Sequence, residues 1–358
     1  MKNRCMPHNP LRFTRVFSFA IVLAVFIGHS FIHCKGSSEE KIDFLNVSFD
    51  PTREMYEEIN REFEKEWNQK STKRINFQQS HGGSGKQARG VIDGLKADVV
   101  TLALSYDIDS IAERSGFIDK DWANSYPNHS TPYYSTIVLL VRAGNPKQIF
   151  DWNDVVRDSI SVITPNPKTS GGARWNYLAA WAYAKNIYKD REEDKIRFIQ
   201  ALYKNTSVLD AGARGSTSTF VQRGIGDVLL AWENEALLAI EESKRKNGGQ
   251  AKFEIVYPSI SILAETPVAA VNKINEKKGT TEVAADYIKF IYSKQGQEIA
   301  AKHFFRPFDN EILKLYSTIF KPIKLVNIRD LEGSWKDAQK KHFAEGGIFD
   351  QIYSDKKF

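Results

Sequence analysis

Short apolar runs alternate along the chain with longer stretches whose apolar residues recur at helical spacing. Residues 42–47 (IDFLNV) are typical of a buried strand, and the apolar residues from Met55 to Trp67 lie on one face of a predicted helix. The same alternation continues through most of the sequence. Strand followed by helix, repeated in this way, predicts an α/β fold in which helices flank mainly parallel sheets.

The pattern also predicts the elements beyond this first unit. Further strands are expected at 75–77, 99–104, 135–141, 160–163, 208–209, 228–232 and 253–257. Helices are expected around 91–95, 151–156, 175–182, 191–204, 220–221, 233–244, 283–292 and 295–304. A chain of 358 residues built in this way is long enough for two lobes, each with its own core.

Each lobe is expected to hold its own sheet, with the chain crossing between them at a hinge. The predicted boundaries are residues 41–135 and 262–358 for lobe 1 and residues 136–261 for lobe 2. Gly144-Asn145-Pro146 ends a predicted strand and is a candidate for the outward crossing, and residues 260–271 are expected to return the chain. The tail from Asp309 onward is expected to pack on lobe 1.

The stretch from Thr164 to Tyr183 contains the strongest candidate site. Ser170-Gly171-Gly172 opens directly into a predicted helix, and the first turn of a helix leaves backbone N–H donors unpaired at the positive end of its dipole. Glycines allow an anion to approach closely, and Ser170 adds a hydroxyl donor. The alternative at this point is an ordinary N-capped helix, since serine is a favoured cap.

Similar loops open other predicted helices. They are residues 80–86 (SHGGSGK), residues 210–216 (DAGARGS), and Trp232 at the end of a predicted strand. Ligands of open α/β sheets bind beyond the carboxyl ends of the strands, which is where these loops lie. The loops offer N–H, hydroxyl and indole donors and few acceptors, which suits a fully ionised oxyanion. Nearby cations either touch the ligand or are solvated or paired structurally; they are Lys86, Arg174 and Arg214.

Catalytic motifs are incomplete. His81-Gly82-Gly83 is similar to an oxyanion-hole sequence, but the glycine that a nucleophile elbow needs two places after Ser84 is replaced by Lys86. Residues 80–86 also miss the phosphate-loop spacing, and the seven histidines form no paired metal-binding motif. We therefore expect no enzyme, no metal site and no cofactor.

The first 34 residues predict export. They carry four basic and no acidic residues, and residues 16–28 (VFSFAIVLAVFIG) match a secretory signal core. Without those four residues the net charge of +6 falls to +2, so nucleic acid is not implied. Cys34 precedes a polar tether at residues 35–40, and its position leaves open two alternatives, a lipid-modified cysteine or a plainly cleaved signal. Either one places the protein outside the cytoplasm.

Four segments carry a specific resemblance. They are residues 46–54 (NVSFDPTRE), 80–87 (SHGGSGKQ), 164–176 (TPNPKTSGGARWN) and 231–235 (AWENE). They closely resemble the periplasmic sulfate-binding proteins of bacterial sulfate/thiosulfate ABC importers, over roughly residues 41–351. The resemblance implies a two-lobed, type II periplasmic binding protein. Such a protein is a monomer that closes on sulfate or thiosulfate and delivers it to permease subunits in the inner membrane.

The resemblance also implies site residues. The ligand donors would be Ser84, Ser170, Gly171, Gly172, Ala213 and Trp232, with Asp50 at the edge of the site. Because the charge of Asp50 would repel an anion, we expect this residue to cap a helix and orient donors. His81 is either a supporting donor or a packed turn residue. A surface sensor or adhesin that keeps the same pocket remains an alternative function, and sulfate and thiosulfate are not ranked by the sequence.

Overall fold

The computed structural model describes residues 41–354. The predicted signal peptide (1–34), the tether (35–40) and Cys34 lie outside these residues. Within the described part, no helix combines the length and apolar character needed to cross a membrane.

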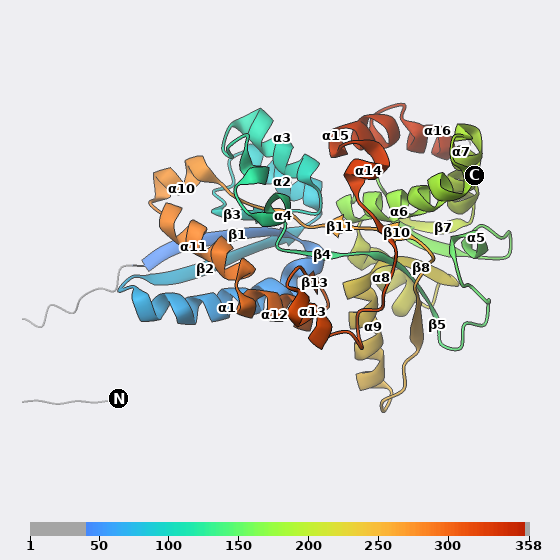
Figure 1. Ribbon diagram of the computed structural model, residues 1–358, viewed down its shortest axis with the longest axis horizontal. Coiled ribbons are helices and arrows are strands. Elements are labelled where there is room, and N and C mark those ends of the chain that lie inside the picture. Colours follow the sequence, from blue (N-terminus) through green and yellow to red (C-terminus); the bar gives the residue numbers. More distant parts are fainter. Residues whose placement is uncertain (1–40, 355–358) are drawn as a thin grey trace, which may run out of the picture. The chain divides into compact units, whose positions relative to one another are not determined.

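The first sheet is mostly parallel and carries helices on both faces (Figure 1). Its strand order is β12-β3-β1-β2, with β1 (Lys41–Phe49) parallel to both β2 (Arg74–Gly82) and β3 (Val99–Thr101), and β12 (Val268–Ala270) antiparallel to β3. Phe44 and Val99 belong to one apolar core and Val47 and Val100 to the other, because successive side chains of a strand point to opposite faces.

Helices complete both cores. One core contains residues of α1 (Arg53–Lys70), α11 (Thr281–Tyr292) and α12 (Lys294–Lys302), and the other contains residues of α2 (Ser84–Ile92), α3 (Ser105–Ser115) and α10 (Asn272–Lys278). A single 3-10 turn, η1 (Asp50–Thr52), joins β1 to α1. We call these elements, with the first sheet, the first lobe.

The second sheet is mixed and has the order β7-β6-β8-β5-β9. β6 (Val162–Pro165) is parallel to β7 (Thr206–Asp210) and β8 (Val228–Trp232), whereas β5 (Ile137–Arg142) is antiparallel to β8 and to β9 (Phe253–Val256). The flanking helices are α5 (Trp152–Val155), α6 (Gly171–Tyr188), α7 (Glu192–Lys204), α8 (Ala213–Val221) and α9 (Glu233–Lys246). We call these elements the second lobe.

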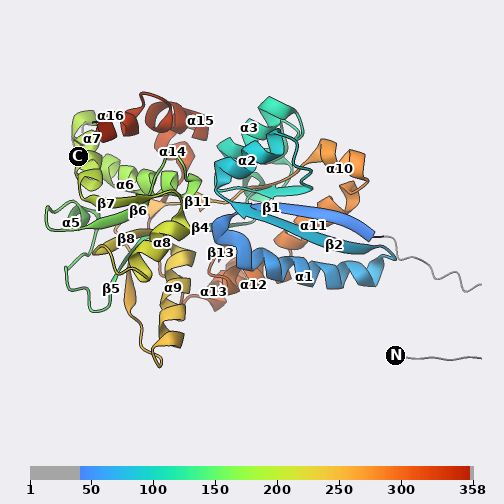
Figure 2. The ribbon, with the colours of Figure 1, turned by 180° about the vertical axis from the view of Figure 1, so that it is seen from behind.

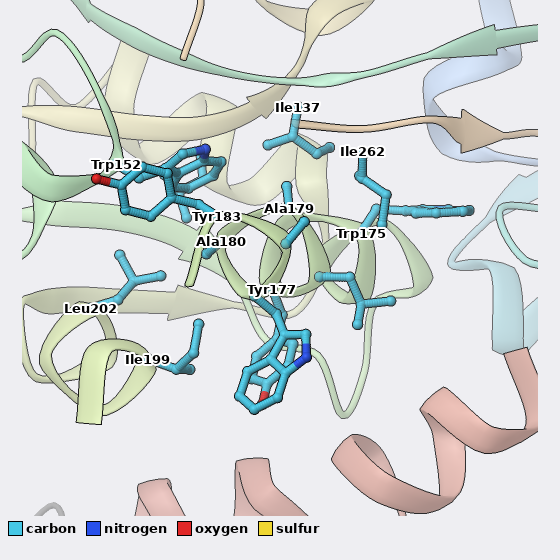
Figure 3. Close-up of a cluster of buried hydrophobic side chains, with 14 of the residues drawn as sticks. Ile137, Trp152, Trp175, Tyr177, Ala179, Ala180, Tyr183, Ile199, Leu202 and Ile262 are labelled. Atoms are coloured by element: carbon cyan, nitrogen blue, oxygen red, sulfur yellow. The ribbon is translucent and has the colours of Figure 1, made fainter. Parts of the chain in front are cut away.

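Helix α6 is buried on almost every side and forms the centre of the largest core (Figure 3). Trp175, Tyr177, Ala179 and Ala180 of this helix have no exposed surface. A helix that is apolar all round can be stable only inside a protein. α6 is therefore held rigidly, which matters because its first residues are Gly171 and Gly172.

Short strands join the two lobes. β4 (Tyr133–Ser135) lies between β11 (Ala264–Glu265) and β13 (Arg306–Pro307), and β10 (Ser261–Ile262) pairs with β14 (Leu325–Val326). The chain leaves the first lobe between β4 and β5 and returns between β10 and β12. The remaining short helices are η2 (Trp122–Asn124), α4 (Pro127–Ser130) and α13 (Asn310–Leu315).

The end of the chain packs on the second lobe. α14 (Ile328–Glu332), α15 (Trp335–Ala338), the π-helical turn η3 (Gln339–Phe343) and α16 (Ile348–Ser354) lie over α6 and α7 (Figures 1 and 2). We call residues 328–354 the C-terminal arm. The expectation that the whole tail packs on lobe 1 is wrong for this arm. The arm carries large apolar residues such as Trp335 and Phe349, and α6 offers a matching apolar surface.

The predicted α/β class with two lobes is confirmed, and most predicted elements are present. Two details differ from the sequence interpretation. β2 continues to Gly82, because backbone pairing with β1 extends to the pair Phe49 and Gly82 and needs no apolar side chain. The predicted strand 135–141 is divided into β4 and β5, which pair in different sheets, so the chain crosses before Gly144 rather than at it.

Candidate functional site

Four helix or turn N-termini meet around a small cavity of about 20 Å³ between the lobes. Its lining comes from the starts of η1, α2, α6 and α8, namely Phe49, Asp50, Pro51, Gly82, Gly83, Ser84, Ser170, Gly171, Gly172, Gly212 and Ala213. The first N–H groups of a helix have no partner inside that helix and point along the positive end of its dipole. This convergence of N–H groups favours an anion. The structure thus brings together every predicted site residue except Trp232.

Ser170 is both the N-cap of α6 and a candidate ligand. Its Oγ accepts a hydrogen bond from Ala173 N at 3.3 Å, so the two alternatives raised by the sequence are compatible. A hydroxyl that accepts a hydrogen bond still has its own proton to donate. Ser170 is buried and lines the cavity, so an anion bound there can accept its proton.

Gly171 is required by the contact between the lobes. A Cβ atom at this position would lie 3.0 Å from Ser84 Cβ, 3.3 Å from Ala103 Cβ and 3.5 Å from Leu104 Cγ. From the sequence, this glycine is expected to allow the close approach of an anion. The structure adds a second reason, because the start of α6 touches the first lobe directly.

Trp232 packs behind the loop and does not line the cavity. Its indole Nε1 donates to the carbonyl oxygen of Gly172 at 3.2 Å, and its ring lies 5.4 Å from that of Phe49. A Cβ atom on Gly172 would lie 3.2 Å from this nitrogen. The indole N–H is thus next to the glycine loop, and in this structure it stabilises the loop.

The loops of the second lobe are bonded to each other. Thr169 Oγ1 donates to the carbonyl of Ala211 at 2.9 Å, and Asn166 N donates to that of Asp210 at 2.8 Å. The carboxylate of Asp210 accepts from Ser216 Oγ at 3.0 Å and from Thr219 Oγ1 at 3.1 Å, both in α8. The starts of α6 and α8 are therefore positioned together.

The hydroxyl of Ser84 is already engaged inside the first lobe. It donates to the carboxylate of Asp107 and accepts from Ala103 N at 3.0 Å. Burial raises the pKa of Asp107, and the nearby charge of Arg174 opposes this shift. Ser84, the first residue of α2, therefore offers its backbone N–H to the cavity rather than its hydroxyl. Asp107 was not among the predicted site residues, and its only signal in the sequence is its place in a helix that follows a buried strand.

Asp50 lines the cavity but does not cap a helix. The N-cap of η1 is Phe49, and Asp50 is the first residue of the turn, with its carboxylate 3.4 Å from Nη2 of Arg53. The predicted capping role is therefore wrong, because the turn begins one residue earlier than the Asp-Pro pair suggests. Its backbone N–H belongs to the first turn and is a candidate donor.

His81 is a packed residue at the end of β2. Its Nδ1 is 2.8 Å from Ser48 Oγ and its Nε2 is 2.6 Å from Gln79 Oε1. Burial and the charge of Arg53 lower its pKa, although Asp50 and Glu54 oppose them. These contacts and the lowered pKa favour the interpretation of His81 as a packed turn residue over its interpretation as a supporting donor.

The cations near the loops do not line the cavity. Arg174 Nε donates to the carbonyl of Pro167 at 3.0 Å, Arg214 pairs with Glu54 at 3.0 Å, and Lys86 is exposed. The pair Arg214–Glu54 connects α8 to α1, and Trp175 Nε1 donates to the carbonyl of Ala103 at 2.7 Å. Both of these contacts join the two lobes, and no Lys or Arg side chain among the residues that the structure describes belongs to the cavity lining.

Comparisons with known proteins agree with this architecture. Residues 46–306 match the family model described as bacterial extracellular solute-binding protein. The chain is 60% identical to the sulfate-binding protein of Escherichia coli strain K12 over 87% of this chain and 93% of that protein. It is 45% identical to the thiosulfate-binding protein of Pseudomonas aeruginosa over 89% of this chain and 94% of that protein. The solved structure of the sulfate-binding protein SubI from Mycobacterium tuberculosis H37Rv matches with a TM-score of 0.72 and 30% identity, covering 84% of this chain and 98% of that one.

Proposed function

The chain belongs to the bacterial extracellular solute-binding protein family, and from this premise we propose that it captures sulfate between its lobes for an ABC importer. Thiosulfate is a second ligand of the same site, since relatives named for each anion match nearly the whole chain. The observation that carries the proposal is the convergence of four N-termini on one small cavity. We further propose a periplasmic monomer that delivers its ligand to permease subunits in the inner membrane, with lipid attachment at Cys34 as one mode of anchoring.

The proposed donors are neutral and come from both lobes. They are the backbone N–H groups of Asp50, Ser84, Gly171, Gly172 and Ala213, the hydroxyl of Ser170 and the indole of Trp232. For Trp232 to contribute, its proton must turn from the carbonyl of Gly172 to the anion. Sulfate has only acceptor oxygens at neutral pH, so a cage of donors can satisfy it completely. No catalytic residue is assigned.

Calorimetric titration of the purified protein tests this proposal. The ligands are sulfate, thiosulfate, phosphate and molybdate under identical conditions. We expect one-to-one binding of sulfate, and absence of measurable heat with both sulfate and thiosulfate would contradict the proposal. Loss of sulfate uptake in a deletion strain, restored by the cloned gene, would separate transport from a sensor or adhesin role.

Removal of single donors should weaken sulfate binding by about ten- to a hundredfold, because a hydrogen bond to a charged group contributes roughly 1.5 to 3 kcal/mol. Ser170→Ala tests the hydroxyl at the start of α6, and Trp232→Phe tests the indole. Ser170→Gly separates the ligand role from capping, since glycine is nearly as good an N-cap as serine. Ser110→Ala is the control, because Ser110 Oγ donates only to the carbonyl of Tyr106 within α3. Changes below about threefold in both Ser170→Ala and Trp232→Phe would show that these donors are wrongly assigned.

A further inference from the structure

The loop that precedes Ser170 is anchored from outside by one lysine. Lys168 Nζ lies 2.7 Å from Asp350 Oδ1 and 2.8 Å from Oδ2, and it donates to the carbonyl of Phe343 at 3.1 Å. Both partners belong to the C-terminal arm, about 180 residues away in the sequence and outside the cavity lining. The ammonium meets the last residue of η3, where the exposed carbonyl end of a helical turn favours a cation.

The arm itself is fixed to the body of α6. Trp335 packs edge-on against Trp175 with ring centres 4.6 Å apart, and Trp181 Nε1 donates to Glu332 at 2.7 Å. Tyr177 Oη lies 3.1 Å from His342 Nδ1, and all these side chains are buried or nearly so. The arm and α6 therefore form one frame. Lys168 connects this frame to the loop from which α6 begins.

Besides the bonds of Asn166 and Thr169 to residues 210–211, this loop is held by internal hydrogen bonds and by contacts with the C-terminal arm. Lys168 N and Ser170 N both bond to Asn166, at 2.9 Å each, so the position of Lys168 is transmitted to Ser170 through a tight turn. Arg174 Nε donates to the carbonyl of Pro167, and its guanidinium lies 5.7 Å from the centre of the Phe343 ring, so a second side chain spans the same junction. A shift at Lys168 would displace the hydroxyl of Ser170 and the first N–H groups of α6 together.

We propose that Lys168 is a positioning residue for the anion site, and that the C-terminal arm, through Asp350 and the carbonyl of Phe343, sets the geometry of the Ser170-Gly171-Gly172 loop. Lys168 does not touch the ligand. This inference rests on the proposed sulfate site. It gives a role in that site to the C-terminal arm, which supplies none of the proposed donors.

The test uses Lys168→Met, which keeps most of the side-chain length and removes the charge. We expect sulfate affinity to fall by about five- to tenfold, a usual size for an interaction that acts through another group. The thermal midpoint of the ligand-free protein should stay unchanged, because exposed ion pairs contribute little to stability. Lys70→Met is the matched control, since Lys70 has similar exposure and joins α1 to α11 by a 3.0 Å ion pair with Asp286. It should leave affinity unchanged.

Asp350→Asn separates positioning from net charge. This variant makes the protein more positive, so general electrostatics predicts tighter sulfate binding, whereas loss of the clamp predicts weaker binding. The double variant Lys168→Met/Asp350→Asn should bind about as weakly as either single variant, since both remove the same contact. Unchanged affinity in Lys168→Met, equal weakening in Lys70→Met, or tighter binding in Asp350→Asn would each overturn the proposal.

A second measurement keeps this inference separate from the proposed function. In the ligand-free protein, amide hydrogen exchange of Ser170 and Ala173, whose N–H groups donate to Asn166 O and Ser170 Oγ, should be faster in Lys168→Met than in wild type and unchanged in Lys70→Met. If wild-type protein binds no sulfate, the proposed function fails, and faster exchange at these two amides still supports the clamp. If exchange is unchanged, the clamp is wrong even where sulfate binds.

Discussion

Gly171→Val is expected to abolish measurable sulfate binding while both lobes stay folded. A Cβ atom added at Gly171 would lie 3.0 Å from Ser84 Cβ, a distance that real Cβ contacts rarely reach, and valine adds two methyl groups beyond it. The neighbours on the other lobe, Ala103 and Leu104, belong to a close-packed core and cannot move aside at low cost. The clash is between lobes, so it is relieved by keeping them apart.

Small-angle scattering with and without sulfate checks this expectation. Wild-type protein should become more compact on adding saturating sulfate, because donors from both lobes must meet on one anion. Gly171→Val should keep the same scattering curve with and without the anion. Gly90→Ala in α2 is the control, since its Cβ meets only Leu95 at 3.8 Å, an ordinary contact. Wild-type affinity in Gly171→Val would mean that the lobes need not touch at α6.

Gly172→Val changes the same loop, but its added atoms meet residues of the second lobe only and not residues of the first lobe. Its Cβ would lie 3.2 Å from Trp232 Nε1 and 3.6 Å from Ser170 Oγ, both within the second lobe. This variant should also lose binding, through displacement of donors and of the anion itself. Gly171→Val therefore tests whether the lobes must close on each other, and Gly172→Val tests whether the donors around the anion must keep their positions.

The local features of the site could be predicted from the sequence, whereas its long-range contacts could not. A Ser-Gly-Gly segment before an apolar helix indicates an N-terminus with free donors, and the structure places Ser170 and both glycines there. The partner of the Ser84 hydroxyl is different. Asp107 lies 23 residues away and is brought to Ser84 by the packing of α2 on α3, which no local pattern encodes. The same holds for Lys168, in the loop before α6, and Asp350, in α16, which meet only because the arm covers α6.

The division into lobes shows a similar limit. The apolar run 135–141 has a single strand-like pattern, but Thr136 separates β4 from β5 and the two strands pair in different sheets. Hydrophobic periodicity predicts that a segment is extended and buried, but it does not predict which sheet the segment joins. The apolar residues of the C-terminal arm likewise indicate that the arm is packed, but their pattern does not say on which lobe. The structure shows that they pack against α6 of the second lobe.

Phosphate is expected to bind at least about a hundredfold more weakly than sulfate at pH 7. At pH 7 phosphate is a mixture of species with one and with two O–H groups, because its second ionisation lies near pH 6 to 7. An unmet buried donor costs about 1 to 3 kcal/mol, and repulsion between two facing donors adds to this. Asp50 lines the cavity, but its carboxylate faces Arg53 at 3.4 Å, and the carboxylate of Asp107 accepts from Ser84.

The pH dependence sharpens this expectation. Sulfate affinity should be nearly flat between about pH 5.5 and 8.5, because sulfate and the amide, hydroxyl and indole donors do not titrate there. The pKa of His81 is lowered by burial and by Arg53, so His81 takes up its proton only below its ordinary range and should not bend the curve near neutrality. Phosphate binding should weaken further as the pH falls from 7.5 to 5.5, since a second O–H adds a second unmet donor.

Calorimetric titrations at pH 5.5, 7 and 8.5 with both anions decide this point, and Asp107→Asn identifies the cause of any failure. Ser84 Oγ has a lone pair left after accepting from Ala103 N, and its proton goes to Asp107, so the hydroxyl could accept a phosphate O–H and pass the interaction to the buried carboxylate. Tight phosphate binding that is lost in Asp107→Asn would establish that route. Tight phosphate binding that survives in Asp107→Asn but is lost in Asp50→Asn would instead show that the Asp50 carboxylate turns from Arg53 into the cavity. Weak phosphate binding in wild type and in both variants would show that neutral donors alone set the preference for a fully ionised anion.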